Sequence, residues 1–185
     1  MKTTRAGHLI LVNAQHPLSE YDWTPDLVTV RGAVRLEREA AERLDRLMAA
    51  LDGWRSITPV SGWRSMEEQR QIYSGSLRDN GAAFTRKFVA LPGCSEHQTG
   101  LAIDLGLTGP DLDFIRPDFP YSGICQKFRT LAADYGFIER YPAGKEAVTG
   151  IAHEPWHFRY VGIPHAHAMA DRGLTLEEYW EEGPT

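Results

Sequence analysis

The sequence predicts an α+β fold in which helices pack around a small, mainly antiparallel sheet. Segments with helical periodicity precede and separate a few segments with the alternating pattern of strands. The order of these segments lacks the regular strand–helix–strand rhythm of a parallel sheet, and this favours antiparallel pairing. A length of 185 residues suits one domain with a proper core. We therefore expect residues 1–185 to form a single domain.

The first two helices are expected in the first half of the chain. The first spans residues 34–51 and ends at Gly53, because its apolar residues follow i, i+3, i+4, i+7 spacing: Leu44, Leu47, Met48 and Leu51. The second begins at Ser65, which forms an S-x-x-E capping box with Glu68, and Gly81 closes it. Two more helices follow, one over residues 124–135 and a short one that Thr175 and Glu178 cap.

Strands are expected at residues 57–60, 101–107 and 156–161. In the second segment, large apolar residues at 101, 103, 105 and 107 alternate with small residues and Asp104. One face is therefore core, and the other presents a single carboxylate to a cleft. In the third segment, aromatic residues at 156, 158 and 160 alternate with His157, Arg159 and Val161.

Two histidines and one aspartate at these strands form a pattern typical of a metal site. His97 and Asp104 lie in SEHQTGLAID (95–104), and His157 closes EPWH (154–157). Imidazole and carboxylate donors together suit Zn²⁺. Three protein ligands leave one position for water, whose pKa zinc lowers to about 7. Glu154, three residues before His157, is placed to take the proton from that water.

The spacing of His97 and Asp104 sets a condition on the chain. Seven residues of extended strand would separate the two by about 23 Å, too far for one metal ion. The chain must turn between them, and Gly100 is the obvious place. We therefore expect His97 on a loop and Asp104 on a strand.

Residues 153–157 also match the H-E-x-x-H zincin signature, which would make His153 a ligand. That motif requires a helix, where residues at i and i+4 share a face. Pro155 and the strand-like HFRYV argue against a helix here. On a strand, His153 and His157 would lie about 13 Å apart. We therefore favour the strand and leave His153 out of the site.

Composition argues against several classes of protein. A net charge of −5 does not suit nucleic acid as the main partner, since phosphate binding usually needs a basic face. No run of 18 apolar residues predicts a membrane span, and the apolar run at 9–12 is too short for a signal peptide. If the chain is a complete gene product, we expect it in the cytoplasm; a removed export signal would overturn this. Cys94 and Cys125 form no disulfide framework.

Four stretches closely resemble the VanX, VanY and VanXY group of D,D-peptidases. They are SGWRS (61–65), FVALPGCSEHQTGLAIDLGL (88–107), YGFIERYP (135–142) and GIAHEPWHFRYVG (150–162). The likeness is strongest to the cytoplasmic VanXY enzymes of glycopeptide-resistant bacteria. The resemblance implies a hedgehog/D,D-peptidase-like domain. It also implies hydrolysis of D-Ala-D-Ala, as a carboxypeptidase on pentapeptide precursors of peptidoglycan, as a dipeptidase, or as both.

The resemblance also implies the roles of the metal-site residues. It makes His97, Asp104 and His157 the zinc ligands and Glu154 the general base. Arg64 would polarise the scissile carbonyl, which is sensible because an oxyanion forms beside the metal.

Three further residues are expected to bind the substrate. The resemblance places Gln69 and Ser95 at the terminal D-Ala. Dipeptidase-leaning relatives can carry an acidic residue at position 61, where it would meet the ammonium of a free dipeptide. Neutral Ser61 therefore favours carboxypeptidase action. The loop 108–123 is an argument for dipeptidase action, because its aspartates at 111, 113 and 118 could fold over the cleft and meet that ammonium.

Two other functions stay open. A non-catalytic zinc-binding module could recognise wall peptides or protein partners, but it would need neither a base nor an oxyanion partner. The other is an L,D-carboxypeptidase of the same architecture.

Overall fold

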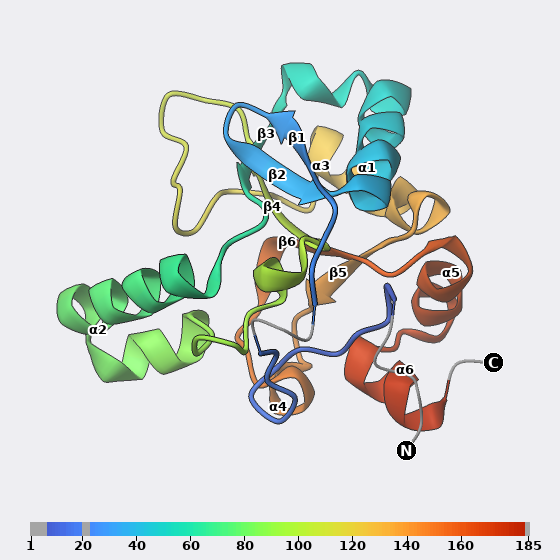
Figure 1. Ribbon diagram of the computed structural model, residues 1–185. Helices are drawn as coiled ribbons and strands as arrows, with labels where there is room; N and C mark the ends of the chain where they lie inside the picture. Colours follow the sequence, from blue (N-terminus) through green and yellow to red (C-terminus); the bar gives the residue numbers. More distant parts are fainter. Residues whose placement is uncertain (1–6, 20–22, 184–185) are drawn as a thin grey trace.

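A computed structural model of the chain describes residues 7–19 and 23–183 and shows two small sheets with helices around them (Figure 1). The strands are β1 (Leu27–Arg31), β2 (Val34–Glu37), β3 (Ile57–Ser61), β4 (Ala102–Leu107), β5 (Phe137–Tyr141) and β6 (Glu154–Tyr160). The helices are α1 (Arg38–Leu51), α2 (Met66–Phe88), α3 (Gly123–Ala132), α4 (Glu146–Thr149), α5 (Ile163–Arg172) and α6 (Leu176–Glu182). Short 3₁₀ helices are η1 (Gly53–Arg55), η2 (Glu96–Thr99) and η3 (Ala133–Tyr135).

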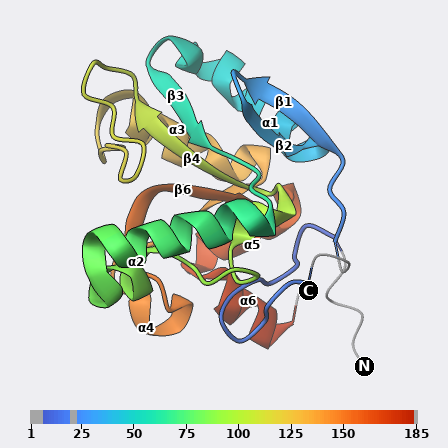
Figure 2. The ribbon, with the colours of Figure 1, turned by 60° about the vertical axis from the view of Figure 1, so that its left-hand side comes forward.

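The larger sheet has the order β3-β4-β6-β5, and each neighbouring pair is antiparallel. Strands β1 and β2 form a separate antiparallel hairpin. The predicted α+β class with a mainly antiparallel sheet is therefore confirmed. In both views α2, which connects β3 to β4, extends away from the side of the sheet where α1 and α3 lie (Figures 1 and 2).

One face of the larger sheet packs against the core, and the other carries polar side chains. Ile103 and Leu105 of β4 and Phe158 of β6 belong to a core cluster that also contains apolar residues of α1 and α3. Because side chains alternate along a strand, Asp104 and His157 point to the opposite face. A second core cluster packs α5 and α6 beside that face: Leu11, Ile138, Val161, Ala166, Met169, Leu176 and Tyr179.

The first helix begins later than predicted, because residues 34–37 form strand β2. Val34 and Leu36 alternate with polar residues, a period of two that the helical interpretation overlooked. The Glu37 side chain caps α1 by accepting hydrogen bonds from the backbone N–H groups of Glu39 (2.9 Å) and Ala40 (3.3 Å). The rest of that helix is confirmed through Leu51.

The second helix begins as predicted but does not end at Gly81. Ser65 forms the expected capping box with Glu68. Gly81 has a φ of 79° and kinks the segment, which then continues as helix to Phe88. Ser76 and Thr85, on the two sides of the kink, share a hydrogen bond of 2.8 Å between their hydroxyls. The second arm therefore folds back on the first.

The remaining predicted elements are confirmed as β3, β4, β6, α3 with η3, and α6. Strands β1 and β5 and helices α4 and α5 were not predicted. Leu107 is more exposed than the alternation implied, at 37%. The space beside Gly106 is filled by the side chains of Leu112 and Pro117 rather than left open as cleft floor. Within the described ranges no helix is long and apolar enough to cross a membrane, and Cys94 and Cys125 are both free thiols.

Candidate active site

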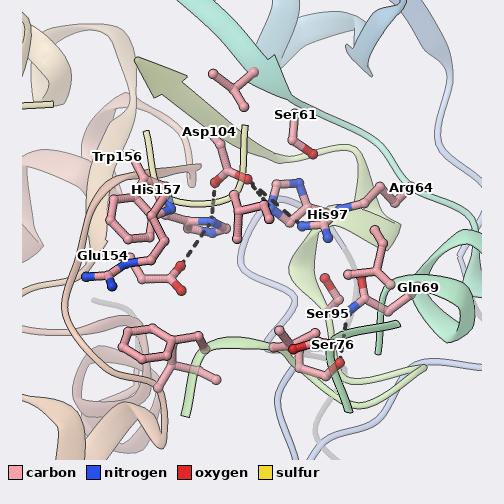
Figure 3. A pocket seen from close by; sticks show the side chains of 18 of the residues that line it. Ser61, Arg64, Gln69, Ser76, Ser95, His97, Asp104, Glu154, Trp156 and His157 are labelled. Atoms are coloured by element: carbon pink, nitrogen blue, oxygen red, sulfur yellow. Dashed lines mark hydrogen bonds and ion pairs between the residues drawn. The ribbon is translucent and has the colours of Figure 1, made fainter. Parts of the chain in front are cut away.

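Three polar residues form a row across three neighbouring strands. Asp104 of β4 is paired with His157 of β6 on one side and with Ser61 of β3 on the other. The Nδ1 atom of His157 lies 2.8 Å from Oδ1 of Asp104. The backbone register of the sheet therefore sets the relative positions of these side chains (Figure 3).

His97 reaches this row from the short helix η2, which precedes β4. Gly100 ends η2 with a φ of 74°, and a Cβ atom there would lie 3.0 Å from the backbone nitrogen of Glu37. The turn therefore requires glycine. It brings Nε2 of His97 to 3.2 Å from Oδ2 of Asp104. The predicted arrangement, with His97 beyond a turn at Gly100 and Asp104 on a strand, is the one observed.

The donor atoms of His97, Asp104 and His157 are placed to bind one metal ion. One donor atom from each lies within 4.8 Å of the others. Nδ1 of His97 is 2.7 Å from the carbonyl oxygen of Gly62, so a proton on Nδ1 leaves Nε2 free to face Asp104. His157 instead presents Nδ1 to the same carboxylate.

Burial shapes the charges of these groups. Desolvation, helped by the charge of Arg64, lowers the pKa of His97 to about 4, so His97 is neutral at physiological pH. Desolvation also acts to lower the pKa of His157. Its hydrogen bond and attraction to Asp104 outweigh this effect and raise the pKa to about 9. Asp104 is buried as well, yet the two histidines hold its pKa below the usual range. Without metal, His157 is therefore protonated at neutral pH, and its positive charge balances the Asp104 carboxylate.

Glu154 and Arg64 flank the metal-binding group on two sides (Figure 3). Glu154 is 7% exposed, and its Oε2 lies 3.9 Å from Nδ1 of His157. Desolvation raises the pKa of Glu154 to about 8, against the opposing attraction of His157. Nη2 of Arg64 lies 4.0 Å from Oδ2 of Asp104. Its Nε is buried and has no hydrogen-bond partner among the described residues.

All eight predicted site residues line one cavity of about 450 Å³. They are Ser61, Arg64, Gln69, Ser95, His97, Asp104, Glu154 and His157. Gln69 is only 2% exposed, so it is not a solvated helix residue. Its Nε2 donates to the carbonyl of Ala90 at 2.8 Å, and its buried Oε1 has no partner within the part of the chain that the structure describes.

The loop over residues 108–122 lines the cavity with Phe114, Ile115 and Arg116. The predicted alternative, in which its aspartates meet the substrate, does not match this arrangement, because none of the three is among the lining residues. Asp113 instead accepts hydrogen bonds from the backbone of Ile115 (2.7 Å) and Arg116 (3.1 Å). The Arg116 guanidinium lies over the ring of Phe88 at 5.1 Å.

His153 lies outside the metal-binding group, as expected. Residues 154–160 form a strand, so the H-E-x-x-H spacing does not place two histidines on one helix face. Nε2 of His153 is 2.7 Å from the Tyr121 hydroxyl and 3.5 Å from Oε1 of Glu139. His153 thus belongs to a polar cluster that ties the loop before α3 to β5.

Four charged residues that were not predicted form a buried network behind His157. Oε1 of Glu96 accepts hydrogen bonds from Nε of Arg140 (2.7 Å) and Nη1 of Arg159 (2.8 Å). Arg140 also donates two hydrogen bonds to Glu177 of α6, at 2.6 and 2.8 Å. The position of Arg159, two residues after His157 on the same strand, was a signal that it shares that face.

The chain matches the family model described as VanY, D-alanyl-D-alanine carboxypeptidase, over residues 33–163. The fold and site thus belong to a peptidase, and this chain is a member of the VanY D-alanyl-D-alanine carboxypeptidase family. It is 46% identical over 175 residues to the bifunctional D-Ala-D-Ala dipeptidase and carboxypeptidase VanXYC of Enterococcus gallinarum, covering 92% of each protein.

Solved structures give the same result. The vancomycin-resistance D,D-dipeptidase VanXYg, in complex with a D-Ala-D-Ala phosphinate analogue, superposes with a TM-score of 0.92. The two are 54% identical, and the match covers 95% of this chain and 71% of that one. A mutant of the D,D-pentapeptidase VanY in complex with Zn(II) gives a TM-score of 0.76 at 31% identity, covering 94% of this chain and 98% of that one.

Proposed function

We propose that the chain is a single catalytic domain that hydrolyses the D-Ala-D-Ala bond of peptidoglycan precursors with the help of zinc. The observation that carries this proposal is the convergence of His97, Asp104 and His157 between Glu154 and Arg64 in one cavity. A module that only recognises peptides has no need of a buried carboxyl group on one side of a metal site and a buried guanidinium on the other.

Zinc fits the donor set of this chain. With zinc bound, two neutral imidazoles and one carboxylate would make a three-ligand site with a net positive charge and a fourth position open for water. The VanY relative has been seen with Zn(II). When bound, zinc would act as a Lewis acid that polarises the scissile carbonyl and lowers the pKa of water.

Glu154 acts as the general base in this proposal. Its carboxylate takes the proton of the attacking water and then passes it to the leaving amine of the terminal D-Ala. Burial raises the pKa of Glu154, so the protonated form is stable enough to exist between the two steps. Arg64, on the other side, stabilises the oxyanion that develops on the carbonyl oxygen.

Gln69, Ser95 and Ser61 would hold the substrate. Gln69 and Ser95 are buried beside Arg64 and contact the terminal D-Ala, for which the free Oε1 of Gln69 supplies an acceptor. Ser61 lies next to Asp104 on the sheet and contacts the amino side of the scissile bond. VanXYg and the VanY relative are vancomycin-resistance enzymes, and we propose the same role here. The likeness to VanXY enzymes implies a cytoplasmic place of action.

The test is release of D-Ala by zinc-loaded protein. The substrates are D-Ala-D-Ala, the UDP-linked pentapeptide precursor and the tetrapeptide that lacks the terminal D-Ala. We expect D-Ala from the pentapeptide, the dipeptide or both, and none from the tetrapeptide. A folded, zinc-loaded protein that is inactive on both D-Ala-D-Ala substrates would contradict the proposal. Activity on the tetrapeptide instead would identify an L,D-carboxypeptidase.

A further inference from the structure

Glu96 lies directly behind His157, on the side away from Asp104. Its Oε2 is 3.6 Å from Nε2 of His157. Both atoms are buried, and neither has a hydrogen-bond partner among the residues that the structure describes. The two atoms lie within ion-pair distance of one another. Carboxylates therefore face both ring nitrogens of His157: Nδ1 faces Asp104 and, at 3.9 Å, Glu154, whereas Nε2 faces Glu96.

The orientation of Glu96 is fixed by its other oxygen. Oε1 accepts hydrogen bonds from both Arg140 and Arg159, whose guanidinium groups are fully buried. Arg140 is held in turn by Glu177, and Arg159 donates to the backbone carbonyls of His8 (2.9 Å) and Ile10 (2.7 Å). With Oε1 occupied in this way, Oε2 must point at His157. The two carboxylates and two guanidiniums are neutral together, so the network can stay charged inside the protein.

We propose that Glu96 is a positioning residue for the metal site, a role that rests on the proposed zinc binding by His157. Its Oε2 accepts the Nε2 proton of His157 and so selects the tautomer in which Nδ1 is free to bind metal. Partners of this kind orient metal-bound histidines, and their loss typically lowers metal affinity 10–100-fold.

The variant Glu96→Gln tests this assignment because the side chain keeps its size. The amide oxygen must take the place of Oε1, since an NH₂ group cannot accept hydrogen bonds from two guanidiniums. The NH₂ group then faces Nε2 of His157. It disfavours a proton there and moves the proton to Nδ1, the atom needed for the metal.

The matched control is Glu177→Gln. It makes the same change in the same buried network and removes the same charge, but the Glu177 carboxylate binds Arg140 rather than His157. Both variants leave one guanidinium charge uncompensated, so both should unfold at a lower temperature than the wild type in the absence of metal. Only Glu96→Gln should alter the metal site.

The experiment measures zinc affinity of the three proteins by competition with a chelator, alongside thermal unfolding. We expect a 10–100-fold weaker affinity for Glu96→Gln and an unchanged affinity for Glu177→Gln. Equal losses in the two variants, or no loss in Glu96→Gln, would overturn the proposal. Neither result bears on whether the wild type binds zinc and releases D-Ala, so the proposed function is tested independently of the role of Glu96.

A measurement on the wild type covers the case in which Glu96→Gln does not fold. Protein labelled with ¹⁵N and loaded with ¹¹³Cd reports by scalar coupling which ring nitrogen binds the metal. We expect coupling from cadmium to Nδ1 of His157 and a slowly exchanging proton on Nε2. Coupling to Nε2, or rapid exchange of that proton with water, would overturn the role of Glu96.

Discussion

Asp104 and His157 occupy paired positions on β4 and β6, and Oδ1 of the aspartate lies 2.8 Å from Nδ1 of the histidine. Backbone pairing between two central strands thus fixes two of the three metal-binding side chains before any metal arrives. Only His97 depends on a loop, and that loop is held by the turn at Gly100. The site is therefore preorganised, because folding of the sheet already orders most of the metal-binding side chains.

This pairing predicts that metal affinity depends on pH. His157 has a pKa of about 9 without metal, so at neutral pH a metal ion must displace its proton. Displacement of this proton alone should raise the apparent affinity about tenfold per pH unit from pH 7, levelling off near pH 9, as measured by chelator competition. His97, with a pKa of about 4, adds no dependence in this range.

Two controls sharpen that measurement. Glu154→Gln removes a second carboxyl group whose proton could be released on binding, so its slope isolates His157. His153→Ala changes a histidine outside the metal-binding group and should leave the slope unchanged. An affinity that does not vary between pH 7 and 9 would show that His157 holds no proton in the metal-free protein.

Arg64→Ala should lower kcat by about 10²–10³-fold, because it removes a donor to the developing oxyanion. Zinc affinity should be retained, since the guanidinium lies 4.0 Å from Asp104 and is not a ligand. Arg116→Ala is the matched control, as it removes a guanidinium that lines the same cavity from the loop. The measurement is steady-state kinetics on the pentapeptide. An equal loss of kcat in the two variants would contradict the oxyanion role of Arg64.

Ser61→Asp should shift the enzyme toward free D-Ala-D-Ala. The new carboxylate would attract the ammonium of a dipeptide, a group that the pentapeptide lacks at that point. We expect the ratio of kcat/KM for dipeptide over pentapeptide to rise severalfold, about what an ion pair of roughly 1 kcal/mol provides. The ratio cancels effects on the metal common to both substrates, and Ser61→Asn supplies a neutral control of similar size. An equal ratio in the two variants would remove Ser61 from substrate selection.

The sequence could predict the site better than its surroundings. The spacing of His97 and Asp104 required a turn, and one glycine offered it. Alternation in the two strands then placed Asp104 and His157 on faces that could meet. These are local arguments, and the structure brings these residues together with Glu154 and Arg64 as the sequence and the resemblance implied. Their chemical roles stay predictions.

The elements and buried charges around the site depend on long-range packing, which local sequence patterns do not indicate. Residues 34–37 lie beside a strong helical pattern, yet pairing with β1 makes them a strand. Charged side chains such as those of Glu96 and Arg140 are exposed in most proteins. These two are buried because neutral pairing across 44 positions of sequence compensates for their desolvation. The helix α2 continues past a kink at Gly81, and Ser76 and Thr85 form a hydrogen bond across that kink, a contact that sequence periodicity does not reveal.

The central claim is that one zinc ion and Glu154 together cleave the D-Ala-D-Ala bond. It is tested most directly by comparing wild type with Glu154→Gln after both are loaded with zinc and their metal content is measured. We predict one zinc per chain in each protein, and a loss of D-Ala release from the pentapeptide of about 10²–10⁴-fold in the variant alone. Equal release by the two zinc-loaded proteins would contradict the account, as would a wild type that releases D-Ala at the same rate without zinc.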